Sequence, residues 1–109
     1  MSKKIEITYG GEKYVLEFTK ETVRQMESAG FNIRAAIDTP LSSIEMLFTG
    51  AFLANHGRAV KNKIPEKIMK DGLPREMFGR LVEMYNEPLE ALFDKEDTDE
   101  GNLEWGANW

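Results

Sequence analysis

A Gly-Gly pair near the beginning of the chain strongly limits how this part can fold. Apolar side chains alternate with polar ones on both sides of the pair, at Ile5, Ile7, Tyr9, Tyr14, Leu16 and Phe18. A period of two around a short glycine turn predicts a β-hairpin, over residues 4–18. Gly10 and Gly11 reach positive φ at little cost, as such a turn requires. Because a lone hairpin is only marginally stable in water, we expect its apolar face to pack on helices.

The remainder of the chain has helical periodicity. Thr19 is a suitable N-cap for a helix over about 20–29, with Phe18 packing on Val23 as a hydrophobic staple and Gly30 in the left-handed position after its end. A short turn or helical fragment follows and closes at Pro40. Further helices are predicted at about 43–56, 65–71, 74–86 and 88–93.

The helix over 43–56 has the strongest signal. Ser42 and Glu45 have the spacing of a capping box, Leu41 and Met46 that of a hydrophobic staple, and Gly57 suits the end of the helix. A wide apolar stripe follows the i, i+3, i+4, i+7, i+8 pattern of one helical face, with Ile44, Leu47, Phe48, Ala51 and Phe52. We expect this helix to be the most buried element.

These patterns predict an α+β fold, mainly α, in which the hairpin packs on a small bundle of four to five helices. The 109 residues are enough for one domain, which we assign to 1–93. The chain contains 19 acidic and 14 basic side chains, of which six acidic ones and one lysine lie in 94–109. The domain is therefore neutral, and 94–109 is expected to be a flexible acidic tail whose end carries Trp105 and Trp109.

No pattern in the sequence indicates catalysis, and we predict that the protein is not an enzyme. Without cysteine it has no disulfide, thiol nucleophile or cysteine-bound zinc. His56, the only histidine, has no carboxylate beside it in sequence that would complete a metal site, and Ser42 and Ser43 lack the Gly-x-Ser-x-Gly setting of a hydrolase. We expect no metal and no cofactor. No apolar run is long enough to cross a membrane.

Residues 58–70 are rich in lysine and arginine, which leaves one alternative function open. Five positive charges here could contact phosphate groups, as in a small nucleic-acid-binding regulator. Against this stand the neutral charge of the domain and the lack of aromatic residues within the stretch. A solvated basic connector is the favoured interpretation, and nucleic acid is an unlikely partner.

Protein binding is the remaining class of function. Exposed tryptophans are costly unless they dock, on this protein or on a partner, and the alternation of Leu103 and Trp105 would also suit strand addition. Five internal methionines are mostly expected in the core, although methionine-rich surfaces adapt to varied apolar helices. If the face of the predicted helix over 43–56 that carries Phe48 and Phe52 were exposed rather than buried, it could form a binding groove. The candidate partner-binding residues are Leu103, Trp105, Trp109, Phe48, Phe52 and Met77.

Five segments resemble a known family, in order and over nearly the whole chain: residues 14–27, 29–33, 47–52, 84–92 and 101–105. In letters they are YVLEFTKETVRQME, AGFNI, LFTGAF, MYNEPLEAL and GNLEW. These segments are similar to those of the tail assembly chaperones of long-tailed, siphovirus-type bacteriophages and prophages. The motifs are diffuse and contain no chemical signature, so no catalytic or ligand residue is carried over.

The resemblance implies a protein that binds the long, helical tape measure protein, keeps it soluble and helps the tail tube to assemble. It further implies a homo-oligomer in the host cytoplasm, possible contact with the major tail protein, and absence from the mature virion. Many members of the family also occur as a longer product of ribosomal frameshifting. A structural tail or connector component stays open as another alternative.

Overall fold

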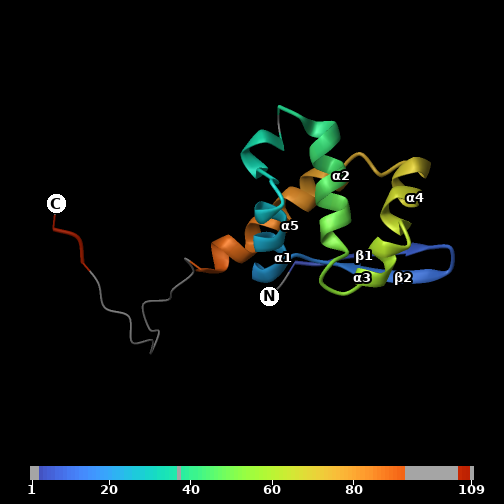
Figure 1. Ribbon diagram of the computed structural model, residues 1–109, viewed down its shortest axis with the longest axis horizontal. Helices are drawn as coiled ribbons and strands as arrows, with labels where there is room; N and C mark the ends of the chain where they lie inside the picture. Colours follow the sequence, from blue (N-terminus) through green and yellow to red (C-terminus); the bar gives the residue numbers. More distant parts are fainter. Residues whose placement is uncertain (1–2, 37, 93–105, 109) are drawn as a thin grey trace.

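The computed structural model describes residues 3–36, 38–92 and 106–108. Figure 1 shows an α+β domain with an N-terminal hairpin and a set of helices, which confirms the predicted fold class. The strands are β1 (Ile5–Tyr9) and β2 (Glu12–Leu16). The helices are α1 (Lys20–Ser28), the 3-10 helix η1 (Ile33–Ala36), α2 (Pro40–Ala51), α3 (Gly57–Lys61), α4 (Ile64–Asp71) and α5 (Met77–Leu92).

The hairpin forms as the alternation predicts. β1 pairs antiparallel with β2, and the register places Ile5 opposite Leu16 and Ile7 opposite Tyr14, so these apolar side chains share one face. Gly10 and Gly11 have φ values of 59° and 82°, the left-handed conformations that a two-residue hairpin turn needs. Leu16 is fully buried, which shows that this face packs on the helices, as expected.

Helix α2 is the centre of the domain and contacts α1, η1, α4 and α5. In Figure 1 it stands between α4 on one side and α1 with α5 on the other, while the hairpin runs beneath. Phe48 and Phe52 of α2 are fully buried and pack edge to face at 5.2 Å. The predicted apolar stripe of this helix is therefore the core of the protein.

The start of α2 differs from the prediction. The helix begins at Pro40, after Thr39 as N-cap, so Ser42 lies inside it and forms no capping box with Glu45. Proline is favoured in the first turn because that turn has no partner for an N–H group, and this preference decides the start. The predicted staple is absent as well, because the Leu41 side chain is 76% exposed.

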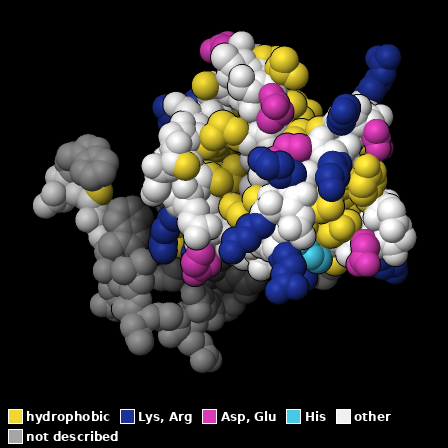
Figure 2. Space-filling view, turned by 45° about the vertical axis from the view of Figure 1, so that its right-hand side comes forward, with side chains coloured by type: hydrophobic (Ala, Val, Ile, Leu, Met, Phe, Trp, Pro, Cys, Tyr) yellow, Lys and Arg dark blue, Asp and Glu magenta, His cyan; other side chains and the backbone are white. Residues whose placement is uncertain are grey.

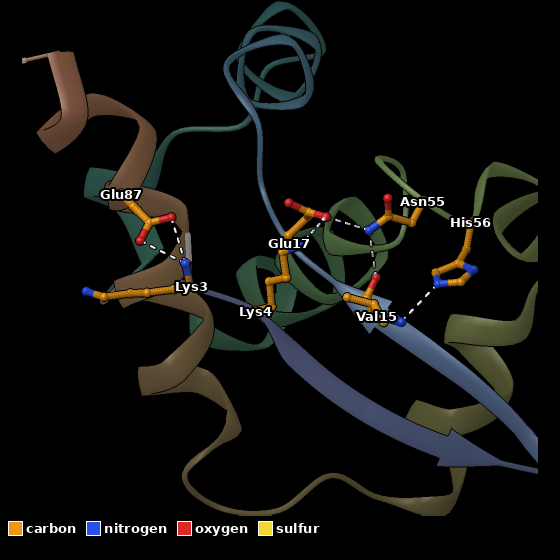
Figure 3. A network of polar contacts seen from close by, with 7 residues as sticks. All are labelled: Lys3, Lys4, Val15, Glu17, Asn55, His56 and Glu87. Atoms are coloured by element: carbon orange, nitrogen blue, oxygen red, sulfur yellow. Dashed lines mark hydrogen bonds and ion pairs between the residues drawn. The ribbon is translucent and has the colours of Figure 1, made fainter. Parts of the chain in front are cut away.

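The end of α2 also differs. The helix stops at Ala51 rather than near residue 56, and Gly57 begins α3 instead of ending α2. The intervening turn carries Asn55 and His56 to the outer edge of β2, where both side chains bond the strand (Figure 3). Part of the predicted basic connector is thus the short helix α3.

Other boundaries agree better with the sequence. Thr19 caps α1 through a reciprocal bond with Thr22, and Gly30 after α1 has a φ of 100°. Helix α4 ends before Gly72 as predicted. The two helices predicted at 74–86 and 88–93 are one, because α5 continues through Pro88. The predicted tail, 94–109, lies outside the described residues except for 106–108, which are exposed and have no regular secondary structure.

Candidate partner-binding grooves

Three of the six predicted partner-binding residues are core residues. Phe48 and Phe52 have no exposed surface and Met77 is 8% exposed, so none of them is available to a partner in this conformation. Their apolar spacing reflects packing of α2 against α5 and the hairpin, which sequence alone does not separate from a binding face. Leu103, Trp105 and Trp109 lie outside the described residues.

His56 has a structural contact. Its Nε2 accepts a hydrogen bond of 2.9 Å from the Val15 backbone N–H, and its ring packs edge to face on Tyr14 with ring centres 5.2 Å apart. An imidazole nitrogen that accepts carries no proton, so the other ring nitrogen carries it in this state. Beside it, the Asn55 amide donates to the Val15 carbonyl at 3.2 Å and to Glu17 at 2.7 Å. These bonds occupy the outer edge of β2 (Figure 3).

A second polar contact fixes the other strand of the hairpin. The backbone N–H of Lys3 donates to both carboxylate oxygens of Glu87, at 2.8 Å each, and so joins the start of β1 to α5 (Figure 3). The hairpin is therefore attached to the turn after α2 and to α5. In both places a polar side chain bonds a backbone group of the hairpin, and Asn55 also bonds the Glu17 carboxylate.

An extended apolar depression lies along α2 and α4. Two adjoining hollows of about 410 and 500 Å³ share Glu45, Glu66 and Met69 in their walls. We call them together the α2–α4 groove. Figure 2 shows a face on which apolar side chains reach the surface among charged ones. The apolar residues that α2, α4 and the segments after them contribute to the groove are Leu41, Ile44, Met46, Leu53, Met69 and Leu73.

Flexible side chains form much of this groove. Met46 is 40% exposed and Leu41 is 76% exposed, while Met69 is half-buried. Met26 of α1 lines the same hollow and packs closely on Gly50 of α2. A Cβ added at Gly50 would lie only 2.5 Å from the Met26 sulfur. Unbranched methionine side chains adapt their shape to different apolar surfaces. Most of the internal methionines lie in the core, as predicted: Met26, Met77 and Met84 are buried, whereas Met46 and Met69 reach the groove surface.

A smaller and separate depression lies between α1 and the second half of α5. We call this hollow, of about 190 Å³, the α1–α5 pocket. Leu89 and Leu92, which are 57% and 58% exposed, belong to its apolar wall, and Lys20 and Arg24 of α1 add positive charge. Neither α5 residue was among the predicted binding residues. The sequence signal that could have identified Leu89 and Leu92 was their i, i+3 spacing, which places both on one face at the end of a helical pattern.

Tyr85 also lines the α1–α5 pocket. Its ring packs edge to face with both Phe18 and Phe31 at 5.2 Å, and the residue is 4% exposed. The phenol oxygen is buried without a hydrogen-bond partner among the described residues. Burial raises the pKa of Tyr85 to about 12, and the Glu27 carboxylate acts in the same direction. A buried polar group without a partner is uncommon in native proteins and requires an explanation.

Within residues 3–36, 38–92 and 106–108, no three His, Asp or Glu side chains are grouped to hold a metal ion. None of the helices described is both long and apolar enough to span a bilayer. The basic residues Arg58, Lys61, Lys63, Lys67 and Lys70 are all exposed, on or beside α3 and α4.

Fold and surface together show a small α+β domain with apolar depressions along α2 and α4 and between α1 and α5. Comparison with family models assigns the chain to one family. It belongs to the family described as "Domain of unknown function (DUF5055)", whose model matches residues 1–109. No curated protein and no solved structure matches the chain significantly.

Proposed function

We propose that this protein is a phage tail assembly chaperone that binds the tape measure protein in the host cytoplasm, keeps it soluble and helps the tail tube to assemble. The resemblance of five segments to that family suggests the role. The single structural observation that supports it is the α2–α4 groove, an apolar, methionine-containing depression on the surface of a small domain.

The groove suits a helical partner on physical grounds. An amphipathic helix presents apolar side chains at i, i+3, i+4 and i+7, and it binds by laying this stripe into an apolar groove. Leu41 and Met46 provide exposed apolar surface on α2, and the half-buried Leu73 lines the groove beyond α4. Methionine adapts to different side chains along a long substrate, which a chaperone that covers such a substrate in many copies needs.

The direct test is co-expression with a tape measure protein encoded beside this chain, followed by affinity purification through a tag. We expect the tape measure protein to become soluble and to remain bound at high salt, because burial of apolar surface is only weakly sensitive to salt. A longer product of the same gene is co-expressed in a second experiment. If the tape measure protein stays insoluble in both experiments and the present protein purifies alone, the proposal is contradicted.

Matched variants locate the binding surface. Leu41→Glu places a charge in the α2–α4 groove at a residue whose exposure leaves the core intact, so we expect loss of co-purification. Leu89→Glu makes the same change at an exposed leucine of the α1–α5 pocket and serves as control. If Leu89→Glu abolishes binding and Leu41→Glu does not, the tape measure protein does not use the α2–α4 groove.

The exposed basic side chains of α3 and α4 favour a second candidate, the nucleic-acid-binding regulator. Binding dominated by phosphate contacts weakens steeply as salt increases, so a titration of duplex DNA at several salt concentrations separates it from the chaperone. A third candidate, a structural tail or connector component, requires the protein to be present in purified virions. A chaperone is expected to be absent from them.

A further inference from the structure

The α1–α5 pocket has a feature that the proposed chaperone function does not use. The Tyr85 phenol oxygen is buried without a partner among the described residues, and the wall of the pocket includes two leucines that are more than half exposed. We propose that this pocket is the docking site for Trp105 of the C-terminal segment of the same chain. The proposal does not depend on the chaperone function.

Charge complementarity supports this occupant. The charged side chains that line the pocket are Lys20, Arg24 and Glu27, so its wall carries one more positive than negative charge. The segment that would approach it, residues 94–104, carries six acidic side chains and one lysine. Opposite charges on two approaching surfaces guide the encounter and fix its orientation. An apolar side chain within an acidic segment matches an apolar pocket beside basic side chains.

The length of the connecting chain permits the contact. Leu92 lines the pocket and is the last described residue of α5, so the segment begins at the pocket itself. Trp105 lies thirteen positions after Leu92, and an extended chain of this length reaches about 45 Å. Attachment keeps the effective concentration of the tryptophan high, so even a small pocket can bind it.

The chemistry of the pocket suits tryptophan. Its hollow of about 190 Å³ has a wall of Val23, Ile33, Pro88 and the two leucines, into which an indole ring would bury apolar surface. A backbone carbonyl of the docked segment would provide the acceptor that the Tyr85 hydroxyl lacks.

The sequence offers a specific probe for this proposal. Trp105 and Trp109 are the only tryptophans of the protein, and both follow α5. Tryptophan fluorescence of the full chain therefore reports on the C-terminal segment alone. We expect emission shifted to the blue, and slower acrylamide quenching, relative to a peptide of residues 94–109. Water-like emission with quenching equal to that of the peptide would overturn the proposal.

Variants of the full chain identify the site and the residue. We expect Leu89→Glu to shift the emission to the red and to accelerate quenching, while Leu41→Glu, the same change in the α2–α4 groove, leaves both unchanged. Trp105→Phe should remove the protected signal and Trp109→Phe should retain it. Far-ultraviolet circular dichroism checks that each variant is folded. An unchanged spectrum in Leu89→Glu, or a protected signal that belongs to Trp109, would refute the assignment.

Dilution separates the same chain from a second copy. Docking within one chain is independent of protein concentration. The blue shift should therefore persist on dilution to concentrations well below the dissociation constant of any self-association. A blue shift that disappears on dilution would place the tryptophan on a neighbouring molecule and overturn the proposal. Because the tape measure test depends on Leu41 and this one on Leu89, either proposal can fail while the other stands.

Discussion

Replacing Phe48 by alanine tests whether the stripe on α2 is core or binding surface. The side chain has no exposed surface, packs edge to face on Phe52 at 5.2 Å and belongs to the main apolar cluster. Removing a buried phenylalanine costs its transfer free energy and leaves a cavity that the surroundings fill only in part. We expect Phe48→Ala to lower the free energy of unfolding by about 3–5 kcal/mol.

This loss is large compared with the total stability of such a domain, which is about 5–15 kcal/mol. Urea denaturation followed by circular dichroism gives the free energy from the midpoint and slope of the transition, and the slope should stay constant if the unfolded states are comparable. In a thermal scan each kcal/mol corresponds to about 4–8 °C for a domain of this size. Phe48→Leu, which leaves a smaller cavity, keeps the effect measurable if the alanine variant does not fold.

Met46→Ala is the matched control on the same helix. Its side chain is 40% exposed at the α2–α4 groove, so we expect a loss below about 1 kcal/mol. If Phe48→Ala also cost less than about 1 kcal/mol, the face of α2 that carries Phe48 would not be the core. The packing argument would then be refuted, and the sequence hypothesis of an aromatic binding face would regain support.

Three further predictions follow from individual contacts. His56→Phe keeps an aromatic ring but removes the acceptor of the half-buried Val15 N–H, so we expect a loss of about 1–3 kcal/mol and faster hydrogen exchange of that amide; unchanged exchange would contradict it. The pKa of Tyr85 is about 12 in the folded protein and 10 ordinarily, so the folded state holds the phenol proton more tightly than the unfolded state does. The contribution of this proton to the free energy of unfolding is complete below pH 10 and is lost as the pH rises from 10 to 12. Tyr85→Phe should flatten the dependence of stability on pH in that range, as measured by urea denaturation at several pH values. Gly50→Ala forces the flexible end of the Met26 side chain aside, while alanine gains about 1 kcal/mol over glycine inside a helix. We therefore expect a net loss below about 2 kcal/mol, and a net gain in a Met26→Ala background, where the clash is absent and the two changes should not be additive.

Local patterns predicted much of the fold because the forces behind them are local. The Gly10-Gly11 turn fixes the hairpin through backbone conformation, and the Thr19 cap with Gly30 sets the limits of α1. The buried face of α2 followed from helical spacing alone. These features depend on residues close in sequence, so one sequence is enough to find them.

Predictions failed where two local signals competed or a distant contact decided. Ser42 and Glu45 have capping-box spacing, yet Pro40 starts α2 earlier. Pro88 suggested a new helix, whereas α5 continues through it, with Tyr85 buried against Phe18 and Phe31 one turn before. The predicted helix over 43–56 placed His56 at its end, whereas His56 lies in the turn between α2 and α3. From this turn it bonds Val15 of β2, which is 41 positions away in the sequence.

The candidate binding surfaces show the same division. Sequence determined which residues are apolar and how they are spaced, so it placed Phe48, Phe52 and Met77 on apolar faces without showing what covers those faces. Only the tertiary structure decided that other elements cover them, while Leu41, Met46, Leu89 and Leu92 remain exposed. The physical reason is that burial depends on which elements pack together, and this packing is settled by contacts between residues far apart in the chain.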